Sequence, residues 1–131
     1  MDMKLELVPI PVSDIERAKA FYLDQLGFAQ DVDVTPTEGV RVVQLTPPGS
    51  ACSIVLSVGL PALSEMEPGT IKGLHLVVSD IDAARNELIE RGVDVGKVDD
   101  SGGGVKYASF SDPDENTLVL QEMSWRTGDA F

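Results

Sequence analysis

An internal repeat is the feature that most constrains how this chain can fold. Residues 12–19 recur 66 positions later as residues 78–85, and both copies begin with the run Val-Ser-Asp-Ile. Near the end of each copy lies a short aliphatic run, residues 54–57 in the first and 118–121 in the second, 64 positions apart. Because the two offsets differ by only two residues, we expect two copies of one supersecondary unit.

The first copy predicts the order strand, helix, strand, strand, strand. The nearly continuous apolar run from Leu5 to Val12 is typical of a strand buried on both faces. Ser13 is the expected helix N-cap, with Glu16 completing a capping box, and Gly27 is the expected end of the helix. Strands are expected next, between turns rich in proline and glycine, at residues 29–35, 40–46 and 52–58.

The second copy predicts the same order. A helix capped by Ser79 and ended by Gly92 is expected after a first strand at residues 73–78. The remaining strands are expected at residues 93–98, 105–111 and 117–123. Residues 59–72 contain two prolines and two glycines and are interpreted as a linker. We therefore expect one domain over residues 1–131, made of modules 4–58 and 73–124.

Composition narrows the class of partner. The chain has 131 residues, the size of one domain, and 10 basic against 22 acidic residues give a net charge of −12. Such a surface repels phosphate groups, so we expect no nucleic-acid or membrane partner but a small organic molecule. A single cysteine, Cys52, allows no internal disulfide, which is typical of a reducing compartment and predicts a cytoplasmic location.

Four short motifs stand out along the chain: residues 11–18, 21–22, 26–28 and 112–116. Together they resemble the motifs of the glyoxalase, bleomycin-resistance and extradiol-dioxygenase superfamily, also called vicinal oxygen chelate. The resemblance covers essentially the whole chain. It implies an α+β fold in which two tandem βαβββ modules form a curled, cup-shaped mixed sheet with the helices outside. Strand edges at the module ends invite pairing, so we also expect a homodimer.

The resemblance also identifies where metal-dependent members of the superfamily bind their ion. The histidine of the first strand is aligned with Leu7, and the glutamate of the last strand with Val119. The matching positions in the other two strands are Val55 and Gly73. None of these four residues has a side chain that binds a metal ion. We therefore expect no metal, no cofactor and a binding protein of the bleomycin-resistance type.

An enzymatic alternative stays open. His75 lies two residues after Gly73, on the same strand face, and is a candidate for acid–base chemistry or for a rebuilt metal site. Glu6 and Glu122 lie an odd number of residues from the family's metal positions, so both are expected to face away from them. The alternative is a glyoxalase-like lyase or isomerase, or a dioxygenase-like enzyme.

Strand periodicity selects the expected ligand-binding face. Counting by two from the four family positions collects apolar side chains with a few polar ones, which is typical of a small-molecule pocket. The polar members either orient an organic ligand, cationic or aromatic, or are satisfied within the core. Trp125, just past the last strand, either stacks on the ligand or closes the end of the core. The candidate ligand-binding residues are His75, Gln121, Ser57, Thr117, Leu7, Val119, Val55 and Trp125.

Overall fold

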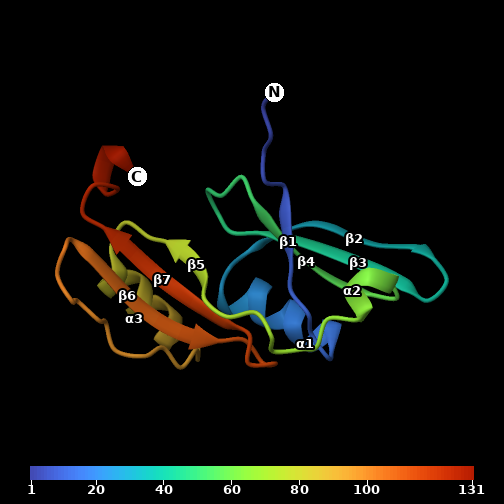
Figure 1. The fold of residues 1–131 in the computed structure, drawn as a ribbon. Coiled ribbons are helices and arrows are strands. Elements are labelled where there is room, and N and C mark those ends of the chain that lie inside the picture. The colour runs from blue at the N-terminus through green and yellow to red at the C-terminus, as the bar shows by residue number, and fades with distance from the viewer. The chain divides into compact units, whose positions relative to one another are not determined.

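The computed structural model describes residues 1–131 and shows a mixed α+β fold with two sheets, one of four strands and one of three (Figure 1). The chain divides into two compact units. The first contains Met1–Ile71 and Pro113–Asn116, and the second contains Lys72–Asp112 and Thr117–Phe131. A short return of the chain, between two strands of the second unit, thus belongs to the first.

The first unit is built around the four-stranded sheet, whose strands lie in the order β1-β4-β3-β2. Strand β1 runs parallel to β4, and the other neighbours are antiparallel. The elements of this unit are β1 (Leu7–Pro9), α1 (Ile15–Ala20), the π-helical turn η1 (Phe21–Gln25), β2 (Ala29–Thr37), β3 (Val40–Thr46), β4 (Ser53–Val58) and α2 (Pro61–Ser64).

One face of this sheet forms the core of the unit together with α1 and η1. Ala18 and Tyr22 are completely buried, as are Val43, Leu45 and Leu56 of the sheet. The rings of Phe21 and Tyr22 meet edge to face, with their centroids 5.1 Å apart. Since side chains alternate along a strand, the sheet residues between these positions point away from α1. We call this side the distal face of the first sheet.

An ionic cluster links α1 to the edge of the same sheet. Arg41 and Lys19 both contact the carboxylate of Asp33, at 2.8 and 2.6 Å, and Arg41 also pairs with Glu16. The hydrogen bonds from Arg41, and secondarily from Lys19, hold the pKa of Asp33 well below its ordinary value. The same contact with Asp33 raises the pKa of Arg41. The cluster faces α1 and is separate from the distal face.

Both helices begin one residue later than the sequence predicts. The N-cap of α1 is Asp14, whose carboxylate accepts the N–H groups of Glu16 and Arg17. The N-cap of the second module's helix is Asp80 rather than Ser79, because the Asp80 carboxylate accepts the Ala83 N–H. In both Ser-Asp pairs the aspartate has the extended backbone that an N-cap requires. The predicted serine caps are therefore wrong.

Ser13 contacts a distant turn instead. Its hydroxyl donates to the Asp114 carboxylate at 2.5 Å, and Arg17 pairs with the same carboxylate at 3.2 Å. Two residues further on, the buried side chain of Asn116 accepts the Ile71 N–H and donates to the Pro11 carbonyl. The predicted turn at 112–116 thus forms, and it also ties this segment to the start of α1.

The second unit has the strand order β5-β7-β6, with β5 parallel and β6 antiparallel to β7. Helix α3 covers one face, where Ala108, Phe110, Leu118 and Leu120 are buried. The side chains on the opposite side of this sheet, away from α3, form the distal face of the second sheet. The elements are β5 (Leu74–Val77), α3 (Ile81–Glu90), β6 (Val105–Ser111), β7 (Thr117–Met123) and the 3-10 turn η2 (Gly128–Ala130).

One expected strand, at 93–98, does not form. The segment bonds to the neighbouring strand through the Gly96 N–H, which donates to the Ser109 carbonyl, and bridges it again at Asp99. The guanidinium group of Arg85 donates hydrogen bonds to the carbonyls of Val95 and Gly96, at 3.2 and 2.7 Å. A continuous ladder is absent, so the second module has the order βαββ.

Strand β1 is also shorter than the apolar run predicts. It covers three residues, since Pro9 and Pro11 have no N–H to donate to a ladder. The expected linker at 59–72 contains the short helix α2, which has a proline at its first position. None of the helices reaches the length and hydrophobicity that crossing a membrane requires.

Candidate ligand-binding site

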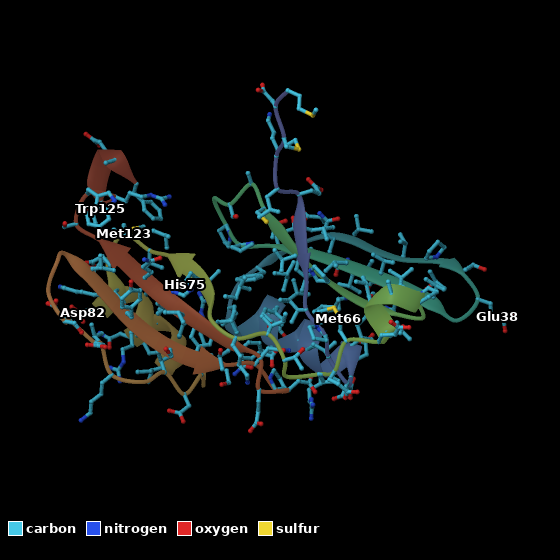
Figure 2. The ribbon with its side chains drawn as sticks, viewed as in Figure 1. Glu38, Met66, His75, Asp82, Met123 and Trp125 are labelled. Atoms are coloured by element: carbon cyan, nitrogen blue, oxygen red, sulfur yellow. The ribbon has the colours of Figure 1, made fainter.

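A pocket of about 240 Å³ lies against the distal face of the first sheet. Val55 and Ser57 of β4, both candidate residues from the sequence, form part of one wall together with Pro9. A second wall comes from the segment that follows β4, including Leu63 of α2 and Met66, which lies close to α2 in Figure 2. We call this the apolar pocket. The sequence analysis did not predict this second wall, because the prolines and glycines of residues 59–72 indicated only a linker.

A second, more open recess of about 440 Å³ lies on the same distal face. We call it the polar recess, and its lining residues are Glu6, Asp31, Val32, Gln44, Thr46, Ser50, Ala51 and Ser53. The Thr46 hydroxyl donates to Asp31, and its oxygen lies 2.6 Å from the Ser53 hydroxyl. The Gln44 amide donates to Glu6 at 3.1 Å.

Two carboxylates reach this recess for reasons that strand alternation does not capture. Glu6 was expected to face away, but it precedes the first residue of β1, so the alternation of that strand does not govern it. Asp31 is an extra residue in a bulge, because the pairing of β2 with β3 shifts register between Gln30 and Val32. The polar alternation of Gln44 and Thr46 in β3 is the one signal that could have indicated this recess.

The distal face of the second sheet carries four of the candidate residues. His75 is paired in register with Val119. His75 and Tyr107 lie edge to face with ring centroids 5.9 Å apart, and His75 is labelled beside β5 in Figure 2. Gln121 pairs with Tyr107, and Thr117 begins the same strand. The alternation predicted for this strand pair therefore places these side chains on one face.

Hydrogen bonds define the chemistry that His75 offers on this face. Its Nδ1 lies 2.5 Å from the Gly73 carbonyl, and because a carbonyl only accepts, Nδ1 must carry the proton. In the neutral imidazole, Nε2 is then left as an acceptor. The Gly73 N–H donates to Thr117 Oγ1 at 2.7 Å, which leaves the Thr117 proton free to donate. One acceptor and one donor therefore face away from α3.

Trp125 and Leu7 complete the set of candidate residues. Trp125 follows β7, and its side chain is 58% exposed, so it does not fill the core of the second unit. Leu7 opens β1 and pairs in register with Ser53 of β4. Its half-buried side chain lies at the family's first metal position, where it offers only hydrocarbon.

The residues at the family's metal positions do not fit a metal ion. Leu7 and Val55 in the first unit, and Gly73 and Val119 in the second, have no side-chain donor. No group of three or more His, Cys, Asp or Glu side chains is arranged to hold an ion. Glu122 cannot complete a site on the distal face, because its carboxylate accepts the Ile81 N–H at the start of α3.

Comparisons with known proteins agree on one family. The model of the Glyoxalase/Bleomycin resistance protein/Dioxygenase superfamily matches residues 4–120. The uncharacterized protein YwkD of Bacillus subtilis (strain 168) is 32% identical over 120 residues, which cover 88% of this chain and 93% of that protein.

Two solved structures are similar over nearly their whole length. One is TnmS3, described as an antibiotic binding protein from Streptomyces sp. CB03234, with 38% identity, a TM-score of 0.81, and coverage of 94% of this chain and 98% of that one. The other is a member of the same superfamily from Sphaerobacter thermophilus DSM 20745, with 35% identity, a TM-score of 0.79, and coverage of 92% and 98%.

Proposed function

The chain belongs to the Glyoxalase/Bleomycin resistance protein/Dioxygenase superfamily, and on that premise we propose that it binds a small organic molecule without a metal ion. One observation carries the proposal: the apolar pocket of about 240 Å³ is lined by Val55, an aliphatic residue at a family metal position. Such a residue removes a metal ligand and adds the apolar wall that small-molecule sites use. The description of TnmS3 as an antibiotic binding protein supports this function.

We propose that the ligand is cationic or aromatic. The net charge of −12 attracts cations over long distances. In the first unit the proposed ligand contacts are Leu7, Val55 and Ser57. In the second unit, Tyr107 and Trp125 have 37% and 58% of their surface exposed, an arrangement that supports stacking on a planar molecule. The remaining proposed contacts there are His75, Thr117, Val119 and Gln121.

A thermal-shift experiment tests this proposal with arylalkyl amines and the corresponding alcohols as probes. A probe at ten times its Kd stabilises the folded state by ~1.4 kcal/mol, which raises the Tm of a domain of this size by about 4 °C. Ser57→Trp, which fills the apolar pocket, should abolish the shift. Ser101→Trp, in an exposed loop, should retain it. If no probe raises the Tm up to its solubility limit, the proposal is refuted.

The metal-free character has its own test. Protein purified without chelator should contain far less than one equivalent of zinc, nickel, manganese or iron by elemental analysis. A stoichiometric ion that is lost in His75→Ala would overturn the metal-free proposal and favour the rebuilt-site enzyme.

A second candidate function, acid–base catalysis at His75, is favoured by one observation. The contact of Nδ1 with the Gly73 carbonyl leaves Nε2 as an acceptor on an exposed face, the state that a general base requires. Turnover of a bound compound should then fall sharply in His75→Gln. Binding that survives without any turnover would leave the binding function alone.

We further propose a cytoplasmic homodimer. Three edge strands have unpaired backbone groups, β1 and β2 in the first sheet and β5 in the second, whereas the 93–99 segment already bonds to β6. Cys52 is free, which suits a reducing compartment. Light scattering during size-exclusion chromatography should give twice the chain mass of 14.0 kDa. A mass that stays at that of one chain across concentrations would refute the dimer.

A further inference from the structure

The directions of the hydrogen bonds in the polar recess leave few free hydrogen-bond donors there. The Thr46 hydroxyl has one proton, which it donates to Asp31. The 2.6 Å contact between Thr46 and Ser53 therefore uses the proton of Ser53. Both hydroxyl protons are thus directed along a chain that ends at the Asp31 carboxylate. A group that enters this recess meets mainly acceptors, so it must itself be a donor.

The two carboxylates of the recess have no basic partner. The ion pairs of the structure include neither Glu6 nor Asp31. Asp33, by contrast, lies only two residues from Asp31 in sequence and contacts both Arg41 and Lys19. Charge-assisted hydrogen bonds from a cationic donor are the strongest that a carboxylate accepts. The recess therefore fits an ammonium or guanidinium group.

Strand β4 connects the polar recess to the apolar pocket. Ser53 lines the recess, while Val55 and Ser57 line the pocket, and the three residues alternate on the same strand face. At a rise of ~3.3 Å per residue, Ser53 lies roughly 7 Å from Val55 and roughly 13 Å from Ser57. A molecule that reaches both sites needs a cationic group at about this distance from its apolar end.

Resting on the binding function proposed above, we propose that the ligand is an elongated organic cation. Its ammonium or guanidinium group lies in the polar recess and is held by Glu6 and Asp31. Its hydrocarbon or aryl end lies in the apolar pocket, against Val55 and Ser57. The two carboxylates select for charge, and β4 sets the distance between the charged and apolar ends.

Three probes of defined length and charge test this assignment by isothermal titration calorimetry. 4-Phenylbutylamine has a cation near the required distance from its ring, 4-phenylbutan-1-ol is its neutral counterpart, and benzylamine is the short cation. The wild-type protein should bind 4-phenylbutylamine at least tenfold more tightly than either of the other two. Equal affinities for the long amine and the alcohol would overturn the cation site, and equal affinities for the two amines would overturn the spacing.

Paired variants separate the recess from the overall charge of the protein. Glu6→Gln with Asp31→Asn should lower the affinity for 4-phenylbutylamine at least tenfold and leave the affinity for the alcohol unchanged. Retained alcohol binding also shows that the variant is folded. The matched control, Glu38→Gln with Glu90→Gln, removes the same charge from exposed positions outside the recess. Glu38 lies at the tip of the β2–β3 hairpin (Figure 2).

The outcomes distinguish this inference from the function on which it rests. If the control pair weakens amine binding as much as the recess pair does, long-range attraction is responsible and the site is refuted. If the amine and the alcohol bind equally and Ser57→Trp abolishes both, the binding function stands and the cation site fails. If no probe binds, the binding function itself fails.

Discussion

Replacing Asn116 with alanine removes the hydrogen bonds that hold the 112–116 turn to Pro11 and Ile71. Asn116 is 1% exposed, and its side chain donates to the Pro11 carbonyl at 2.8 Å and accepts the Ile71 N–H at 3.1 Å. A buried backbone group that loses its partner costs about 1–3 kcal/mol. The carbonyl of Pro11 is buried, whereas the half-buried Ile71 N–H can recruit water. We therefore expect a total loss of about 2–4 kcal/mol.

Urea unfolding followed by far-ultraviolet circular dichroism measures this loss. The typical free energy of unfolding of a domain is about 5–15 kcal/mol. A loss of about 2–4 kcal/mol therefore shifts the midpoint urea concentration well beyond experimental error. Asn86→Ala is the matched control, because Asn86 is exposed on α3 and alanine has the higher helix propensity. The control should be as stable as the wild type or slightly more so. A loss below about 1 kcal/mol in Asn116→Ala would refute the reasoning.

Three further predictions follow from single residues. Glu115 has a φ of 67°, a conformation that costs an L-residue about 1–2 kcal/mol, so Glu115→Gly should raise the Tm despite the added chain entropy, and an unchanged or lower Tm would contradict this. Because its partners depress the pKa of Asp33, the stability that Asp33 contributes is present above about pH 4 and is lost as the pH falls through the lower folded-state pKa. Urea midpoints measured across acidic pH should therefore fall less steeply for Asp33→Asn than for the wild type, and equal slopes would argue against it. Gly104→Ala should lower the Tm more than Gly103→Ala. Both glycines have a positive φ, but only at Gly104 would the new methyl group collide with Ser124. Equal Tm values for the two variants would contradict this collision.

Much of the strand content could be predicted from local pattern. Three strands have the predicted bounds, at residues 40–46, 105–111 and 117–123, because alternating apolar residues between turn-forming segments specify each of them. The strand expected at 93–98 fails for a reason outside its own sequence. Arg85, one turn into α3, donates hydrogen bonds to two of the backbone carbonyls in that segment. A repeat in the sequence therefore did not guarantee a repeat in the hydrogen bonds.

The candidate site was predictable to the same extent. Val55 and Ser57 follow from alternation along β4, and the structure places both in the wall of one pocket. Asp31 does not follow, because a bulge changes which face its side chain takes. The wall formed by Leu63 and Met66 depends on how the segment after β4 folds back, and no periodicity signals that.

The amino-acid sequence alone determined the family and the absence of metal-binding side chains at the family's metal positions, because these depend on residue identity and on spacing along the chain. Tertiary structure decided which polar groups meet. The carboxylates of Glu6 and Asp31 face one recess, and the 112–116 turn binds Ser13 and Pro11. Such contacts join residues up to 105 positions apart, and their geometry depends on strand pairing and bulges that local pattern does not encode.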